Sequence, residues 1–156
     1  MDNSVNIRKC DCADLEVLIK MRIEFLKEAG HVKDDEDVSD LYNEIREYIL
    51  MHLNKDLFFW LAEIENEVVA SGAVSIWDKL PIKAGNGSKV GYFSNMYTRP
   101  LYRKKGIASC LMKHIIQFLK AEGIQKAMLH ALEDGKGVYK KLGFGTSDNF
   151  MEMKIM

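Results

Sequence analysis

The chain carries two kinds of apolar periodicity, and each predicts a different kind of element. Segments whose apolar residues recur every three to four positions are expected to be amphipathic helices. Runs of β-branched and aromatic residues bounded by turn residues are expected to be strands. In chain order the expected elements are strand 5–9, helix 11–30, helix 40–53, strands 57–64, 67–77 and 90–98, helix 105–121, strand 126–131, a short helix that Gly143 ends, and strand 149–155. Asp11 is a candidate cap of the first helix, because its carboxylate can accept backbone N–H bonds.

The order of these elements, β-αα-βββ-α-β-α-β, predicts an α/β fold with a mixed central sheet. Strands 57–64, 67–77 and 90–98 follow one another closely and should form an antiparallel meander. Strand 90–98, helix 105–121 and strand 126–131 should form a right-handed parallel crossover, which leaves helices on both faces of the sheet. The carboxyl ends of strands at such a change of direction are where α/β sheets bind ligands.

The composition supports a single globular domain over residues 1–156. Hydrophobic residues make up 47% of the chain, charged residues 29%, and only two residues are proline, so a disordered chain is not expected. The N-terminus has no basic start followed by an apolar run, and no segment reaches roughly 18 uninterrupted apolar residues. These features predict a soluble, cytoplasmic protein with no membrane partner. Cys10, Cys12 and Cys110 lack zinc-like spacing, so we expect reduced thiols and no metal.

Charge is divided unevenly along the chain, although the net charge is only −1. Residues 1–80 carry nine basic against 18 acidic side chains, whereas residues 81–156 carry 13 basic against five acidic ones. This asymmetry suggests an anionic ligand held by the second half and a cationic one near the first. The simpler interpretation is two solvated faces of opposite charge. Nucleic acid is not an expected partner, because the basic residues are scattered without a recognition pattern of interleaved aromatic residues.

The segment RPLYRKKGIAS, residues 99–109, places three consecutive basic residues at the start of an expected helix. A helix start leaves about four backbone N–H groups without partners and carries roughly half a positive charge. Gly106 removes a side chain where phosphate oxygens would touch the backbone, and Ala108 keeps the next turn shallow. Phosphate therefore suits this position. The patterns G-x-x-x-x-G-K-[ST] and G-x-G-x-x-G are absent, which argues against nucleotide hydrolysis and dinucleotide binding.

Two motifs resemble the signatures of the GNAT superfamily of N-acyltransferases. RKKGIA at residues 103–108 is similar to the R/Q-x-x-G-x-G/A signature, and MYTRP at 96–100 resembles the strand and proline that lead into it. Further along, GVYKKLGF resembles the second signature, in which Tyr139 is followed after three residues by Gly143 and Phe144. The resemblance covers residues 90–144 closely and the whole chain loosely. It implies a GNAT-like sheet and one acyl-CoA N-acyltransferase domain.

The resemblance also implies acetyl-CoA as cosubstrate and assigns the residues that would hold it. The backbone amides of residues 104–109 would cradle its pyrophosphate, and a bulged strand would pair with its pantetheine arm. An N–H of Met96 or Tyr97 would face the thioester oxygen and stabilise the oxyanion. The implied cofactor-binding residues are Met96, Tyr97, Thr98, Arg103, Lys104, Lys105, Gly106, Ile107, Ala108 and Ser109.

Tyr139 matches the residue that in many relatives protonates the leaving thiolate, and we favour this role over the alternative, a packing residue of a short helix. The sequence departs from the pattern at two places. Leu132 stands where many relatives carry a cofactor-contacting asparagine, and the strand at 90–98 has no glutamate to serve as base. Candidate bases are Glu24, Glu28, His31, Asp34 and His130. A water chain that needs no single base is the default expectation.

The expected function is therefore transfer of an acetyl group from acetyl-CoA to a primary amine of a small molecule or peptide, through a tetrahedral intermediate. The alternative is a non-catalytic acyl-CoA sensor or interaction module, which the missing glutamate and asparagine would favour. The acidic segment 33–40 suggests a cationic acceptor. Aromatic residues at positions 77, 92, 93 and 97 could line a pocket, although most such residues on strands belong to the core. The expected strand at the C-terminus is a candidate edge for a homodimer.

Overall fold

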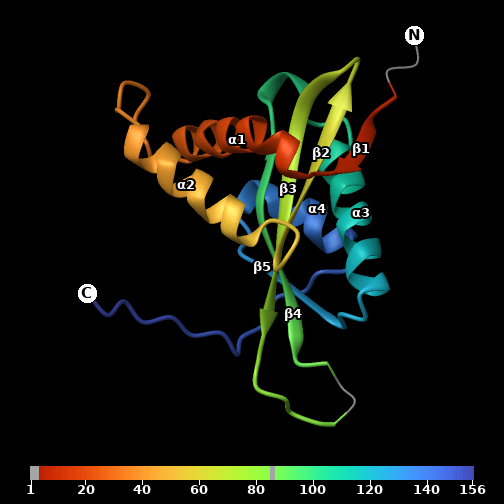
Figure 1. Ribbon diagram of the computed structural model, residues 1–156. Coiled ribbons are helices and arrows are strands. Elements are labelled where there is room, and N and C mark those ends of the chain that lie inside the picture. Colours follow the sequence, from red (N-terminus) through yellow and green to blue (C-terminus); the bar gives the residue numbers. More distant parts are fainter. Residues whose placement is uncertain (1–3, 85–86) are drawn as a thin grey trace.

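The computed structural model describes residues 4–84 and 87–156, and in them five strands form one sheet (Figure 1). The strands are β1 Asn6–Lys9, β2 Leu57–Ile64, β3 Glu67–Asp78, β4 Lys89–Thr98 and β5 Lys126–Leu129. The α-helices are α1 Leu15–Glu28, α2 Ser39–His52, α3 Ile107–Ala121 and α4 Lys136–Lys141. Among these helices none is long and apolar enough to cross a bilayer.

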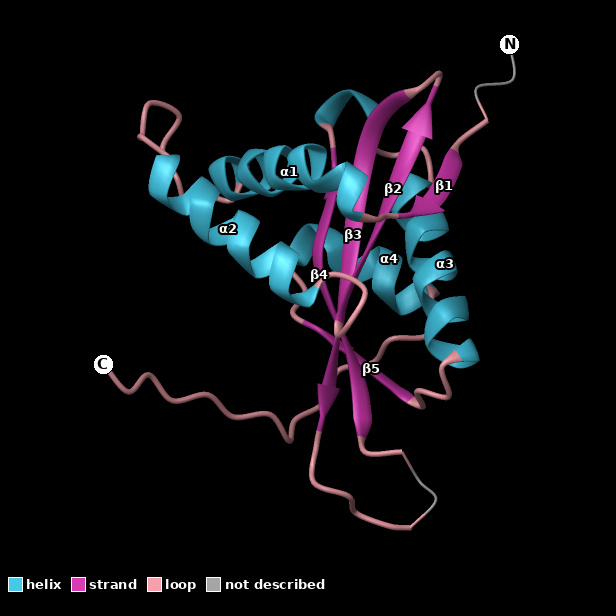
Figure 2. Cartoon of the chain, in the orientation of Figure 1, coloured by secondary structure: helices cyan, strands magenta, loops and turns pink. Residues whose placement is uncertain are grey.

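The strands lie in chain order, and the type of pairing changes once. Neighbouring strands from β1 to β4 are antiparallel, and β4 pairs with β5 in parallel through the crossover helix α3. Helices α1 and α2 cover one face of the sheet, and α3 and α4 cover the other (Figure 2). The predicted fold class, a mixed α/β sheet with helices on both faces, is confirmed.

Each face of the sheet has its own core because side chains alternate along the strands. On one face Trp60, Ala62 and Val74 pack against the buried stripe of α3, which includes Leu111 and Ile115. On the other face the apolar side of α1 and α2 packs against the alternate positions of β2 and β3. The buried residues of this second core are Cys10, Leu18, Ile19, Ile49, Leu53, Leu57, Phe59, Leu61 and Ala73.

The strand expected over 149–155 is wrong. Residues 145–156 form no helix or strand. The Phe150 ring still lies 5.4 Å from that of His130, and the chain then ends in an extended tail that points away from the sheet (Figure 1). The alternation of apolar and polar residues suits a strand, but a strand also needs a partner for its backbone groups. Met151, Met153 and Ile155 instead remain exposed. Smaller differences lie at element ends: α3 begins at Ile107 rather than 105, and β5 ends at Leu129 rather than 131.

The N-terminal strand is fixed to the rest of the fold by one arginine. Arg8 on β1 donates to both carboxylate oxygens of Asp14, at 2.9 and 2.8 Å, and to Glu63 on β2 at 3.0 Å. Asp14 also accepts the backbone N–H of Asp11, whose own carboxylate accepts the N–H of Ala13. Asp11 therefore caps the short turn Cys12–Asp14 that precedes α1 and not α1 itself, whose cap position is Asp14. The hydrogen bonds from Arg8 hold the pKa of Asp14 below its usual range.

We expect Asp14→Asn to lower the free energy of unfolding at pH 7 by about 2 kcal/mol, because it leaves a half-buried guanidinium short of one partner. The lowered pKa of Asp14 means that its contribution is complete above the pKa of an unfolded aspartate, about 4, and is lost as the pH falls through the folded-state value. Urea unfolding at pH 7 and pH 3 measures this. The difference from the wild type should shrink at pH 3, and the exposed-loop variant Asp35→Asn should match the wild type at both pH values.

Candidate active site

The sheet opens between β4 and β5 because their pairing stops halfway along β4. The paired positions run from Val90 opposite Lys126 to Phe93 opposite Leu129, where β5 ends. Beyond this point β4 continues to Thr98, and no described strand pairs with its outer edge. Residues 94–98 therefore offer free backbone groups along one side of the strand.

A bulge in β4 lies directly at this opening, where the resemblance implied one. Ser94 pairs with Ala73 and Tyr97 with Ser71, so two residues of β4, Asn95 and Met96, stand opposite the single residue Gly72. Asn95 adopts a left-handed backbone with φ of 53°. Gly72 makes room for the bulge, because a Cβ there would lie 2.7 Å from the Met96 sulfur.

After the bulge, neighbouring side chains of β4 again point to opposite faces of the sheet. Met96 packs on the core beneath α3. Tyr97 is buried on the α1 face, with its ring 6.0 Å from that of Phe25. The Thr98 carbonyl accepts a 2.8 Å bond from Arg103 Nε, which ties the turn after β4 to the end of the strand.

The start of α3 leaves a row of backbone donors unpaired. Lys104 and Gly106 both have a left-handed backbone, with φ of 60° and 78°, and Gly106 precedes the first helical residue, Ile107. In the described part of the chain the N–H groups of residues 104–109 have no acceptor; the first bonded one is that of Cys110, at 3.1 Å from the Gly106 carbonyl. A Cβ on Gly106 would meet nothing within 4 Å, so the space beside it is open.

Two arginines near this turn are held by carboxylates of α1. Arg99 contacts Glu24 at 2.9 Å, and Arg103 contacts Glu28 at 2.6 Å. The Arg103 guanidinium therefore points to α1, and the free charge at the helix start comes from Lys104 and Lys105. The hydrogen bond from Arg103 lowers the pKa of Glu28, which weakens it as a proton acceptor.

Tyr139 lies on α4, half-buried beside the core beneath α3. Its ring is 6.1 Å from Phe144 at a steep angle, and a Cβ on Gly135 would lie 2.8 Å from the ring. Burial raises the pKa of Tyr139 above its ordinary value, so the phenol keeps its proton at neutral pH. Its hydroxyl makes no hydrogen bond to any described residue.

The five candidate bases do not lie together at one site in the structure. Glu24 and Glu28 are occupied by arginines, and His31 and Asp34 are exposed in the loop after α1. His130 follows β5 and contacts the Tyr92 hydroxyl at 2.5 Å.

The four aromatic residues expected to line a pocket divide into two groups. Trp77 stacks on Tyr92 with ring centroids 4.3 Å apart, and this pair lies partly exposed next to His130. Phe93 and Tyr97 are buried. Phe93 belongs to the core beneath α3, where its ring meets that of Phe144 at 5.7 Å.

Sequence reasoning missed Arg22 on α1. Its Nη1 lies 3.4 Å from Asn95 Oδ1, and Asn95 in turn donates to Ser71 at 3.2 Å. The signal was present: Arg22 stands four positions after the buried Leu18 and three before Phe25, which puts it on the sheet-facing side of the helix.

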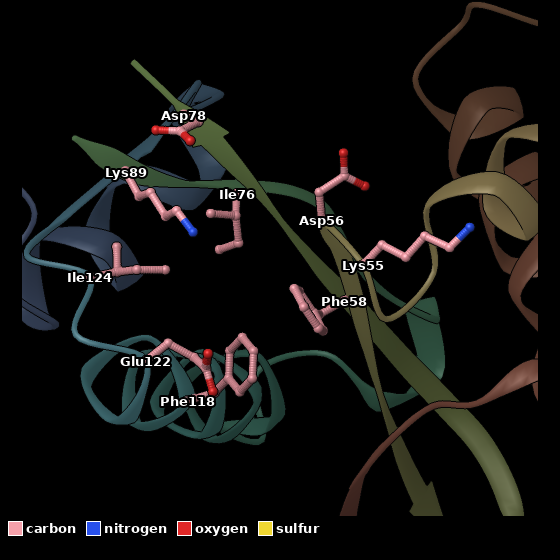
Figure 3. A pocket seen from close by; sticks show the side chains of 9 residues that line it. All are labelled: Lys55, Asp56, Phe58, Ile76, Asp78, Lys89, Phe118, Glu122 and Ile124. Atoms are coloured by element: carbon pink, nitrogen blue, oxygen red, sulfur yellow. The ribbon is translucent and has the colours of Figure 1, made fainter. Parts of the chain in front are cut away.

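A cavity of about 370 Å³ lies elsewhere, at the opposite end of α3 (Figure 3). Phe58, Ile76, Phe118 and Ile124 form its apolar part, and charged side chains including Lys89 and Glu122 surround them. Because Glu122 follows the last residue of α3, this cavity is separated from the helix start by the length of that helix.

Comparison with known proteins places the chain in a family. The model of the acetyltransferase (GNAT) family matches residues 18–144. A predicted acetyltransferase from Clostridium acetobutylicum, solved with acetyl-CoA, is 31% identical, with 97% of each chain covered and a TM-score of 0.85. The chain therefore belongs to the GNAT family, and the protein is an acetyltransferase.

More distant structures share the fold. A GCN5-related N-acetyltransferase from Ralstonia eutropha is 23% identical over 97% of this chain and 99% of its own, with a TM-score of 0.78. AAC(6')-Iy in complex with the bisubstrate analogue CoA-S-monomethyl-acetylneamine is 17% identical over 98% and 99% of the two chains, with a TM-score of 0.74. No curated protein sequence matches the chain significantly.

We expect Gly106→Ala to lower the free energy of unfolding by roughly 1 kcal/mol, because alanine is strained at a φ of 78° although its Cβ meets open space. Urea unfolding measures this cost. Gly145→Ala is the control, since its Cβ also meets nothing within 4 Å and its backbone is not left-handed. An equal loss in both variants would mean that the turn does not require glycine.

Proposed function

We propose that the protein transfers the acetyl group of acetyl-CoA to a primary amine of a small molecule or peptide. The observation that carries the proposal is the row of unpaired N–H groups at residues 104–109, which lies just beyond the unpaired edge of β4. These donors suit a pyrophosphate and a peptide-like pantetheine arm, and both belong to coenzyme A. The acetyl-CoA in the similar Clostridium acetobutylicum structure supports the same cosubstrate.

The cosubstrate would be held by backbone more than by side chains. The amides of residues 104–109 bind the pyrophosphate, and Lys104 and Lys105 supply positive charge from exposed positions. Arg103 acts indirectly, by fixing the turn to Glu28. The pantetheine arm pairs with the open edge of β4 at residues 96–98, and an N–H of Met96 or Tyr97 faces the thioester oxygen.

In the reaction, the neutral amine nitrogen attacks the thioester carbonyl carbon to give a tetrahedral intermediate. The carbon–sulfur bond then breaks, the Tyr139 hydroxyl protonates the departing thiolate, and the nitrogen loses its extra proton to water. The Tyr139 phenolate then takes a proton from water, which restores the phenol. At ordinary pKa values, near 10 for a phenol and 8.5 for a thiol, this proton transfer is unfavourable by roughly 2 kcal/mol. Burial, which raises the pKa of Tyr139, adds to this cost, so the proposal requires that the water-poor cleft also raises the pKa of the departing thiol.

Ordered water takes the amine proton in this proposal. The carboxylates of α1 that are nearest to β4 are engaged by Arg99 and Arg103, and His130 already contacts Tyr92. Family membership favours the enzyme over a non-catalytic acyl-CoA module. Release of free thiol from acetyl-CoA with one good amine would exclude the module, whereas coenzyme A binding without thiol release across a broad amine panel would support it.

The acceptor is a cationic amine in this proposal, as the acidic first half of the chain suggests. The exposed carboxylates of the loop between α1 and α2 support this, while Glu24 and Glu28 are already neutralised. A preference for uncharged amines in an acceptor panel would contradict it. A homodimer is also proposed, and the exposed apolar tail is the segment that would benefit from a partner.

We expect Ala108→Glu to weaken coenzyme A binding at least tenfold, because a carboxylate in the first turn of α3 repels the pyrophosphate. The same carboxylate interacts favourably with the helix dipole, so the free energy of unfolding should stay equal or rise by about 0.5 kcal/mol. Titration calorimetry with coenzyme A and urea unfolding give the two readouts. Gln117→Glu adds the same charge to an exposed later turn of α3 and should leave the affinity unchanged. Equal affinities in both variants would contradict pyrophosphate binding at this helix start.

We expect Tyr139→Phe to lower kcat by about a hundredfold or more while the Kd of coenzyme A changes less than twofold, because only the transferable proton is removed. A thiol-release assay and calorimetry measure these quantities. In the wild type the raised pKa of Tyr139 delays the alkaline loss of kcat until above about pH 10, and this loss should be absent in the variant. Tyr48→Phe on the exposed part of α2 is the control. Unchanged turnover in Tyr139→Phe would remove this residue from the mechanism.

A further inference from the structure

Arg22 is a recessed arginine without a carboxylate partner. Arg8, Arg99 and Arg103 each contact a carboxylate at 2.6 to 2.9 Å, and Arg46 is exposed on α2. Arg22 is largely covered on the sheet-facing side of α1, and no carboxylate of the described residues lies within 4.0 Å of its guanidinium. Buried charges in proteins are normally paired, because taking an ion out of water costs free energy that only a partner offsets.

The contacts that Arg22 does make leave most of its donors unused. A guanidinium has five N–H groups. One reaches Asn95 Oδ1 at 3.4 Å, which is long for a hydrogen bond, and the group lies 5.6 Å above the Phe25 ring. Burial lowers the pKa of Arg22, and no ionic partner compensates for it. Asn95 and Phe25 therefore fix the direction of the Arg22 side chain, but most of its N–H groups have no hydrogen-bond acceptor among the described residues.

The position of Arg22 relates it to the reaction. Asn95 is the left-handed residue of the bulge and directly precedes Met96 and Tyr97, whose N–H groups belong to the proposed oxyanion site. Arg22 belongs to α1 and reaches the bulge from the face of the sheet that α1 covers. The row of free amides follows the same end of β4, after Thr98, and Glu28, which contacts Arg103 of that turn, is roughly 9 Å along α1 from Arg22. Arg22 is thus placed for the acceptor rather than for the pyrophosphate.

We propose that Arg22 binds an anionic group, a carboxylate or a phosphate, carried by the amine acceptor. The inference rests on the proposed function and narrows its substrate class to amines that carry an oxyanion near the reacting nitrogen. A planar guanidinium matches either group with two parallel hydrogen bonds. Such an acceptor still carries a positive charge on its amine when it approaches the protein. Its ammonium group is attracted by the acidic side chains near α1, and its anionic group pairs with Arg22.

The test uses pairs of amines that differ only by the anionic group: lysine and cadaverine, histidine and histamine, phosphoethanolamine and ethanolamine. Each is assayed for thiol release with acetyl-CoA and for calorimetric binding to the enzyme loaded with coenzyme A. The wild type should favour the anionic member of at least one pair by tenfold or more in kcat/KM. The first two pairs report a carboxylate and the third a phosphate.

We expect Arg22→Gln to lower kcat/KM for the preferred anionic acceptor by roughly ten- to a hundredfold, mainly through KM, as loss of a charge-assisted pair predicts. The partner amine without the anion should change less than twofold, and so should the Kd of coenzyme A. Arg22→Lys should recover part of the preference. Arg46→Gln removes an exposed arginine from α2 and should behave as the wild type.

The stability of the variants separates binding from a structural role. A partly buried charge without an ionic partner does not stabilise the fold, so Arg22→Gln should keep or raise the urea midpoint. A large fall in that midpoint, or an equal fall in kcat/KM for both members of each pair, would overturn the inference, and so would a wild type that binds no anionic amine. Binding of an anionic amine that Arg22→Gln abolishes, without thiol release by the wild type, would support the inference and contradict the transfer reaction.

Discussion

The end of pairing between β4 and β5 at Phe93 is the constraint on which the site depends. A strand inside a sheet has no unpaired backbone groups. A ligand that pairs like a strand therefore needs a stretch of strand that has no neighbouring strand on one side. β5 has only four residues, and the bulge opposite Gly72 shifts the register of β4 just beyond the last shared pair. The shortness of β5, the bulge in β4 and Gly72 therefore together produce the unpaired edge of β4.

Ion pairs between α1 and the turn after β4 fix this opening from the side. Arg99 and Arg103 reach from the turn to Glu24 and Glu28, and Arg99 also donates to the Val68 carbonyl at 2.8 Å. These contacts join the first half of the chain to the second, which carry opposite net charge. Some of the opposite charges of the two halves of the chain thus pair with each other inside the protein. The charged side chains that are left without such a partner are the ones available to attract a ligand.

The elements of the fold were largely predictable from periodicity, and the places of error have physical causes. The buried stripes of α1 and α3 and the β-branched runs of β2 and β3 have strong local signals. The C-terminal segment has an equally regular pattern, but a strand needs a neighbour, and the sequence does not record whether one is available. The start of α3 was misplaced by two residues because Lys104 and Gly106 take left-handed conformations that compose a turn rather than a helix. Arg22 was missed because a helical arginine suggests solvent until its neighbours on the same helix face are considered.

The tail after Phe150 has a consequence for the handling of the protein. Met151, Met153 and Met156 are three of the nine methionines, and all three are exposed in chain that forms no helix or strand. Oxidants reach such thioethers first and convert them to polar sulfoxides, and a protease can bind the same extended segment without unfolding the sheet. Both kinds of damage fall on residues that lie outside the two cores, so a preparation can age chemically at its C-terminus while its folded body stays intact.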